Sequence, residues 1–120
     1  MAQRMIIGMM ATRPHQIFIK DELGNCAEIL PWESQRLRKH SPDGFNWGYG
    51  GSGPAQLALA LLLHYRKDKY FSVRWYQDFK WEVIASLPQT DFEIPEKKVT
   101  DWIELKKGSH EKICEKSKRM

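Results

Sequence analysis

The stretch GFNWGYGGSGPAQLALALLLHYR, residues 44–66, decides the fold of this chain. Its first part, residues 44–53, holds five of the eight glycines, interleaved with three aromatic residues. Its second part, which begins at Pro54, is a run of strong helix formers in which leucine falls on every side. A helix that is apolar all round is buried. The sequence therefore predicts a central helix over residues 54–66, with the rest of the chain packed around it.

The junction between the glycines and this helix has the features of a helix start. Ser52 or Gly53 suits the capping position, and Pro54 suits the first helical position, where its missing N–H is not needed. The free first-turn N–H groups, at Ala55 and Gln56, and the helix dipole would form a natural anion site. The candidate anion-binding residues are Gly48, Gly50, Gly51, Ser52, Gly53, Gln56, Arg36, Arg38 and His40.

The letters GYGGSG, residues 48–53, match the GxGxxG pattern of dinucleotide-binding loops, but their context differs. A turn rather than a buried strand precedes them, and no Lys-Ser or Lys-Thr pair follows, which excludes a P-loop. We favour a structural role, in which the glycines let a tight loop pack its aromatic residues over the helix start. At least one glycine of this loop is then expected to have a positive φ.

Composition and charge restrict the choice of function. A chain of 120 residues with 42% hydrophobic content supports one domain with a real core, which we place at residues 3–108. The net charge of +4 falls entirely in residues 106–120, so residues 109–120 are expected to be a flexible basic tail, and nucleic-acid binding to be weak or absent. No apolar run is long enough to span a bilayer, and no apolar leader is present, so we expect a cytoplasmic protein. The spacing of Cys26 and Cys114 predicts free thiols and no zinc site.

The residues before residue 44 predict a small sheet. MIIGMM (residues 5–10), HQIFIK (residues 15–20) and CAEIL (residues 26–30) are apolar or β-rich runs, and a Gly-Asn pair between the last two is a hairpin signal. We expect a three-stranded antiparallel meander from them. Residues 31–43 have turn character and a cluster of basic residues.

Two more helices are expected after the central helix. Residues 70–87 place apolar side chains on one face and stop before Pro88, and a third helix opens at Pro95 and ends at Gly108. Residues 90–94 alternate and are interpreted as a short extended segment. The predicted fold class is α+β, a small three-stranded antiparallel sheet packed against about three helices. The aromatic residues that are candidates for partner binding are Trp47, Tyr49, Trp75 and Trp81.

The blocks HSPDGFNWGYGGSGPAQLALALLLHY (residues 40–65) and YQDFKWEVIASLP (residues 76–88) resemble a family of small proteins of unknown function carried on phages, plasmids and integrated elements. The resemblance covers about residues 5–105. It implies a mobile genetic element as the context, and it implies no chemistry. The extensions before residue 5 and after Gly108, and the basic stretch at residues 32–39, depart from the family's pattern.

Three functions are compatible with these residues. The first is an accessory protein that binds a host or element-encoded protein, for example to inhibit a host defence system. The second is a binder of a phosphate or nucleotide at the glycine loop, and a nucleic-acid-binding accessory protein ranks below it because residues 1–105 carry no net charge. The third is an enzyme, which the sequence supports least: it has no Ser-His-Asp order, no paired carboxylates beside the loop and no metal ligands, and only His40 and Asp43 resemble an acid–base pair. We assign no catalytic residue, no metal site and no cofactor.

Overall fold

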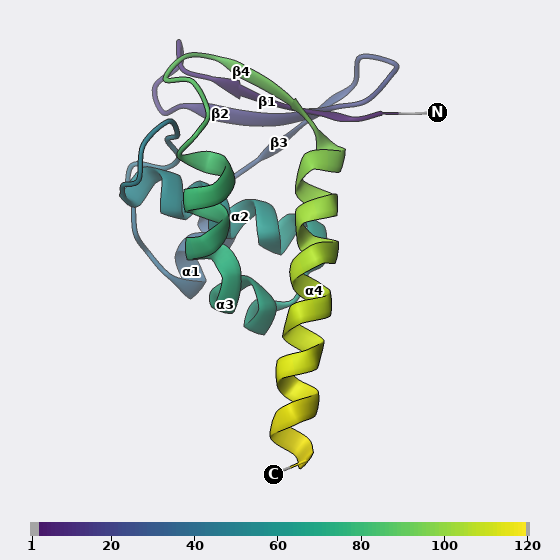
Figure 1. The fold of residues 1–120 in the computed structure, drawn as a ribbon. Coiled ribbons are helices and arrows are strands. Elements are labelled where there is room, and N and C mark those ends of the chain that lie inside the picture. The colour runs from purple at the N-terminus through teal and green to yellow at the C-terminus, as the bar shows by residue number, and fades with distance from the viewer. Residues whose placement is uncertain (1–2, 120) are drawn as a thin grey trace.

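The computed structural model describes residues 3–119 of the chain, with side chains described for residues 3–108. Within that range it is an α+β fold with four strands in one sheet and four α-helices, one strand more than the sequence predicts and one short helix more. Figure 1 shows the sheet along one side of the molecule and the helices gathered on the other side.

The sheet extends the predicted meander by one strand. Its members are β1 (Met5–Met9), β2 (Gln16–Lys20), β3 (Cys26–Ile29) and β4 (Phe92–Pro95), in the order β3-β2-β1-β4. All neighbouring strands are antiparallel. The extra strand, β4, forms from the segment predicted as extended, and Phe92 lies opposite Gly8 of β1. A Cβ at Gly8 would come within 2.1 Å of the Phe92 ring, so the missing side chain makes room for the ring.

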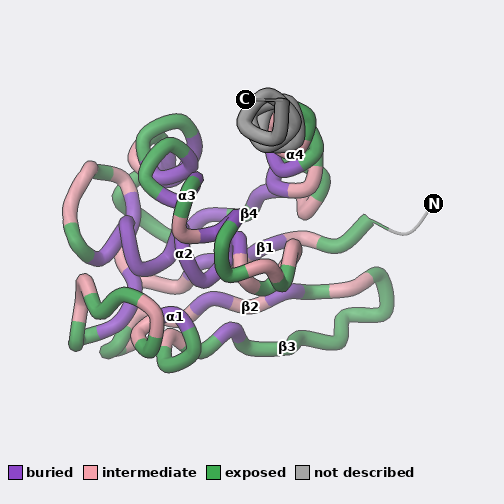
Figure 2. The backbone as a smooth tube through the Cα atoms, turned by 90° about the horizontal axis from the view of Figure 1, so that it is seen from below, coloured by how far each residue is buried: buried purple, intermediate pink, exposed green. Residues whose placement is uncertain are grey.

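The helices cover one face of the sheet. They are α1 (Trp32–Leu37), α2 (Ser52–Arg66), α3 (Lys69–Phe79) and α4 (Glu96–Arg119), and a π-helical segment, η1 (Lys80–Ile84), continues α3. As predicted, α2 is central, because every residue from Gly53 to Leu62 is buried. It packs against α1, α3, η1 and α4. Figure 2 colours α2 as buried over most of its length.

Several helix boundaries differ from those predicted. Residues 32–37 form α1 rather than a turn, and the helix predicted over residues 70–87 changes to π-helix at Lys80. Helix α2 begins at Ser52, two residues before the predicted first position, with Gly51 as its cap. These boundaries depend on contacts between distant segments, which override local helix signals.

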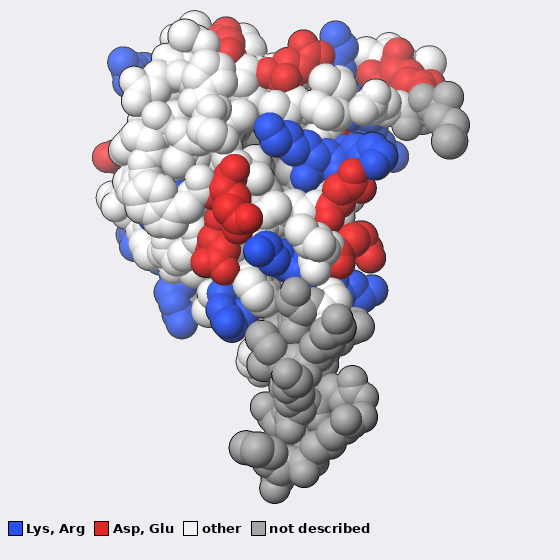
Figure 3. All heavy atoms as spheres, in the orientation of Figure 1, with Lys and Arg blue, Asp and Glu red and all other residues white. Residues whose placement is uncertain are grey.

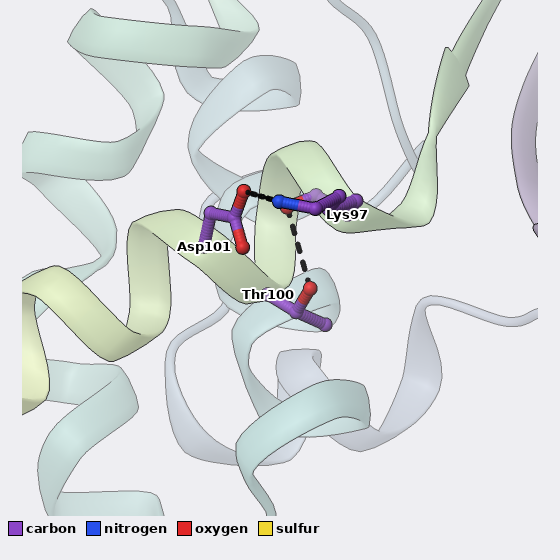
Figure 4. Close-up of polar contacts among 3 residues, drawn as sticks. All are labelled: Lys97, Thr100 and Asp101. Carbon is purple, nitrogen blue, oxygen red and sulfur yellow. Dashed lines mark hydrogen bonds and ion pairs between the residues drawn. The ribbon is translucent and has the colours of Figure 1, made fainter.

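Helix α4 also differs, because it continues through Gly108 to Arg119. A glycine inside a helix costs only about 1 kcal/mol and is tolerated. The first turns are supported by an ion pair between Lys97 and Asp101, four residues apart, and by a hydrogen bond from Thr100 to the Lys97 carbonyl (Figure 4). The side chains of residues 109–120 lie outside the described part, so the flexible tail stays a prediction. No described helix has the length and apolar content needed to cross a bilayer.

Candidate functional site

The glycine loop is fastened to the end of η1 through Gly48. The Gly48 N–H donates to the Ile84 carbonyl at 3.0 Å, and the Gln89 Nε2 donates to the Gly48 carbonyl at 3.0 Å. The φ angle of Gly48 is +84°, which confirms the predicted positive φ in this loop. A Cβ at this position would lie 3.0 Å from the Leu87 carbonyl oxygen. Gly48 therefore permits both the turn and the close approach to the segment after η1.

The next two glycines of the loop make room for aromatic rings. A Cβ at Gly50 would come within 2.1 Å of the Trp81 indole, and one at Gly51 would come within 2.3 Å of the Tyr49 ring. Both rings nevertheless remain accessible, with Trp81 62% and Tyr49 42% exposed. We call these two side chains the aromatic platform. Two large rings are thus held against backbone while they face solvent.

A buried lysine supports the platform from η1. The Lys80 side chain is only 7% exposed, and its ammonium lies 4.5 Å from the Trp81 ring centroid and 3.5 Å from the Gly50 carbonyl oxygen. A cation at this distance is attracted to the negative face of an indole. Among the described residues, no carboxylate forms an ion pair with Lys80. The indole and the Gly50 carbonyl are therefore the groups that hold this charge.

The other two candidate partner-binding residues are part of the core. Trp47 is fully buried, donates from Nε1 to the Thr90 carbonyl at 2.8 Å, and packs edge-on against Phe92. Trp75 is 7% exposed and packs near Phe71. Their periodic positions beside apolar neighbours do not distinguish a core ring from a surface ring. Of the four predicted aromatic residues, the structure leaves only Tyr49 and Trp81 accessible.

Gln56, a predicted anion contact, is the centre of a buried hydrogen-bond network. Its Oε1 accepts from the backbone N–H groups of His40 and Ser41, at 2.8 and 3.1 Å. Its Nε2 donates to the Ser34 hydroxyl and the Arg38 carbonyl, at 2.8 and 3.1 Å. All the donors and acceptors of this fully buried amide are used. Gln56 therefore joins α1 and the following loop to α2.

The remaining predicted anion contacts do not converge on the helix start. The Ala55 N–H donates to the Gly51 carbonyl at 3.1 Å, because the helix begins earlier than predicted. The Arg36 guanidinium lies over the Trp32 ring, 5.2 Å from its centroid. Arg38 reaches the network through its carbonyl, while its guanidinium donates to the Leu37 carbonyl. Of the first-turn positions, Ser52 is exposed, and Gly53 is buried but borders a cleft.

His40 is held beside the same network. Its Nε2 lies 2.6 Å from the Tyr76 hydroxyl, and the two rings are tilted with centroids 5.4 Å apart. Burial lowers the pKa of His40 below its usual 6.5, and the positive charges of Lys80 and Arg38 lower it further. These effects favour the neutral imidazole near neutral pH.

A cleft of about 540 Å³ opens at the start of α2. It is lined by Ser52 and Gly53 of the helix, Tyr49 of the platform, and Arg13 and His15 from the loop before β2. A second cleft of about 360 Å³ shares Arg13, His15 and Tyr49 with it. Arg13 and His15 were not predicted for this site, because they are far from the glycine loop in the sequence and no local signal connects them. Within the described side chains, no group of three or more His, Cys, Asp or Glu is placed to hold a metal.

Comparison with known proteins identifies a family. The model of a family described as a family of unknown function, DUF6166, matches residues 18–105. The chain belongs to this family. The match extends from β2 into α4 and includes the glycine loop, α2 and η1. No curated protein and no solved structure matches the chain.

Proposed function

We propose that this protein is a binding protein rather than an enzyme, and that it recognises another protein through the aromatic platform of Tyr49 and Trp81. The proposed partner is a host protein or a protein encoded by the same mobile element, and inhibition of a host defence system is the proposed outcome. The biological context rests on the resemblance of residues 40–65 to proteins of phages, plasmids and integrated elements.

The observation that carries the proposal is the seating of two exposed rings on glycine backbone. Trp and Tyr are the residues that contribute most often to binding energy at protein interfaces. Immobilising a large side chain on binding costs about 0.5–1.5 kcal/mol, and a ring that is already held avoids much of that cost. The missing side chains at Gly50 and Gly51 let the Trp81 and Tyr49 rings lie against the backbone before any partner arrives. The rings are therefore suited to contact a flat or shallow apolar surface.

The charge distribution favours a protein partner over nucleic acid. Residues 1–105 carry no net charge. Figure 3 shows acidic and basic side chains interspersed over the face that carries α3 and α4, without a field of a single sign. Proteins that bind nucleic acid use a basic patch to neutralise phosphates. We therefore rank nucleic-acid binding below protein binding.

The test compares capture of proteins from a host lysate by three forms of the chain. The first is the wild type, the second is the double variant Tyr49→Ala and Trp81→Ala, and the third is the matched control Tyr70→Ala. Tyr70 is 85% exposed on α3 and does not rest on a glycine. We expect a protein that the wild type and the control retain and that the double variant loses, with all three forms still unfolding cooperatively. Equal capture by the three forms would contradict the proposal.

A small anionic ligand, such as a nucleotide, is a second candidate for the cleft at the start of α2. Arg13 and His15 line it together with Ser52 and Gly53 at the start of α2, and Tyr49 offers a ring on which a base could stack. Ligand binding to the folded state raises the melting temperature by mass action. We expect a nucleotide from a panel that includes cyclic dinucleotides to stabilise the wild type and the control Arg74→Ala, but not Arg13→Ala. Absence of any shift across the panel would remove this candidate.

A further inference from the structure

The strand β3 forms an edge of the sheet, and its outer side is open. Among the described strands it pairs only with β2, and Cys26, Ala27 and Glu28 are all exposed (Figure 2). An edge strand presents unpaired N–H and C=O groups that can pair with another chain. At the hairpin turn the Asp21 N–H donates to the Asn25 carbonyl. Because hydrogen-bonded pairs alternate in an antiparallel ladder, Cys26 and Glu28 direct their backbone groups toward the free edge.

Two clefts lie along this strand. One, of about 210 Å³, is lined by Ile29, Leu30 and Trp32 together with Ala60 and Leu63 of α2. The other, of about 340 Å³, is lined by Ile19, Cys26 and Ala27 together with Arg4 and Asp21. His64 borders both clefts. Helix α2 therefore leaves space beside β3.

The two clefts are spaced like alternate side chains of a strand. The first borders β3 near Ile29 and the second near Ala27, two residues away along the chain. Side chains two residues apart point to the same face of a strand and are about 7 Å apart. Peptides that add a strand to a sheet edge gain affinity from main-chain hydrogen bonds and specificity from pockets for alternate side chains.

The charge of this edge indicates the kind of segment that it fits. Residues 21–35 contain Asp21, Glu22, Glu28 and Glu33 and no Lys or Arg. These four carboxylates outnumber the two cations beside the strand, which are Arg4 at the second cleft and Lys20 opposite Cys26. The same stretch exposes Leu30 and Trp32 to about half of their surface. A basic segment with apolar residues at alternate positions complements both features. Pairing of β3 with β3 of a second copy would instead bring two acidic stretches together, which is unfavourable.

We propose that the free edge of β3 binds an extended, basic segment of a partner protein as an added strand, with alternate apolar side chains in the two clefts. The surface is separate from the aromatic platform, so the proposal does not depend on the proposed function. In this proposal the acidic residues of segment 21–35 select a basic partner, and they also disfavour pairing between two copies of the chain.

The experiment titrates the isotope-labelled full chain with a nine-residue peptide that alternates Lys and Val. A peptide of the same length that alternates Glu and Val is the charge control. We expect amide shifts confined to residues 21–35 and His64, and several-fold slower hydrogen exchange at Cys26 and Glu28, with the basic peptide only. The proposal is overturned by equal shifts with the acidic peptide, by shifts at β4 instead, or by no shift at about 1 mM peptide, the weak end of measurable affinity.

Two variants test the backbone and the charge separately. Glu28→Pro removes an N–H from the free edge and is expected to abolish binding, whereas Glu93→Pro on the opposite edge strand is its matched control. The double variant Glu22→Gln and Glu33→Gln changes only exposed charges, so it keeps the fold and is expected to weaken binding several-fold. Unchanged binding by this double variant, or a stable dimer of the chain alone on sedimentation, would overturn the proposal.

Discussion

The indole of Trp81 lies directly on Gly50, where a Cβ atom would come within 2.1 Å of the ring. Residues thirty-one positions apart thus form one surface feature, with Lys80 beside both of them. The π-helical segment η1 begins at this lysine, and short π-helical turns often occur where a protein needs a particular side-chain placement. The contact explains why this position of the loop is a glycine, because any side chain there would occupy the space of the indole.

Two alanine substitutions in the glycine loop should differ in their cost. We expect Gly48→Ala to lower the free energy of unfolding by about 1–3 kcal/mol, because φ is positive and backbone atoms surround the new Cβ. Gly50→Ala should cost less, because φ is not positive there and the new Cβ meets the outer edge of an exposed ring rather than backbone. Urea unfolding measures both values, and tryptophan fluorescence reports the displaced ring. A larger loss for Gly50→Ala than for Gly48→Ala would contradict this reading.

Replacing the central amide of the buried network should be costly. Gln56→Leu keeps a similar volume but leaves the His40 and Ser41 N–H groups without their acceptor, while the Ser34 hydroxyl keeps only its bond to the Pro31 carbonyl. Each buried unsatisfied group costs about 1–3 kcal/mol, so we expect a total loss of about 3–5 kcal/mol. The exposed Gln77→Leu on α3 is the matched control and should change stability by less than about 0.5 kcal/mol. Equal unfolding midpoints for the two variants would show that the network contributes little.

Stability should fall on mild acidification. The pKa of His40 is lowered by burial and then by Lys80 and Arg38, and the pKa of His64 is lowered by burial and then by Lys67. The unfolded chain therefore takes up protons at a higher pH than the folded chain does. The contribution of these two histidines to stability is fully present above about pH 6.5, the pKa of a histidine in the unfolded chain. It is lost as the pH falls from that value toward their lowered pKa values in the folded protein.

Urea unfolding at about pH 7.5 and about pH 5 measures this loss. The double variant His40→Gln and His64→Gln should show a smaller difference between the two conditions. The pKa of Asp21 is also lowered, mainly by the Asn25 backbone N–H, but it acts only below its usual value of 3.8 and so outside this range. A wild type that becomes more stable at the lower pH would refute the assignment.

The C-terminal residues should be dispensable for folding. Helix α4 is held to the body by the buried side chains of Val99, Trp102 and Ile103, and by Lys106, whose ammonium lies 5.5 Å from the Trp75 ring centroid and 3.5 Å from Glu82. All of these precede residue 109. Deleting residues 109–120 is therefore expected to leave the melting temperature nearly unchanged. A fall of more than about 5 °C, equivalent to about 1 kcal/mol in a small domain, would show that these residues dock.

Local sequence patterns were sufficient for the elements that depend on neighbouring residues. The meander of β1, β2 and β3 follows from short β-rich runs and a Gly-Asn turn, and the burial of α2 follows from leucine on all of its sides. The positive φ of Gly48 was also predictable, because dense glycine is costly unless the backbone requires it.

The candidate site was only partly predictable. Gln56, Arg38 and His40 do lie together, but they form a satisfied internal network rather than an open anion site. Helical periodicity could not distinguish the exposed Trp81 from the buried Trp75. The change to π-helix at Lys80 alters the direction in which every later side chain of the segment points.

The sequence by itself determined the three-stranded meander and the burial of α2, because hydrophobic period and turn chemistry act over a few residues. It did not determine α1 or the change to π-helix at Lys80. Only the tertiary structure decided that β4 joins β1, that Trp81 rests on Gly50, and that Arg13 and His15 border the start of α2. These pairings bring together residues separated by thirty or more positions. Their geometry is set by the packing of the whole core, which no local pattern encodes.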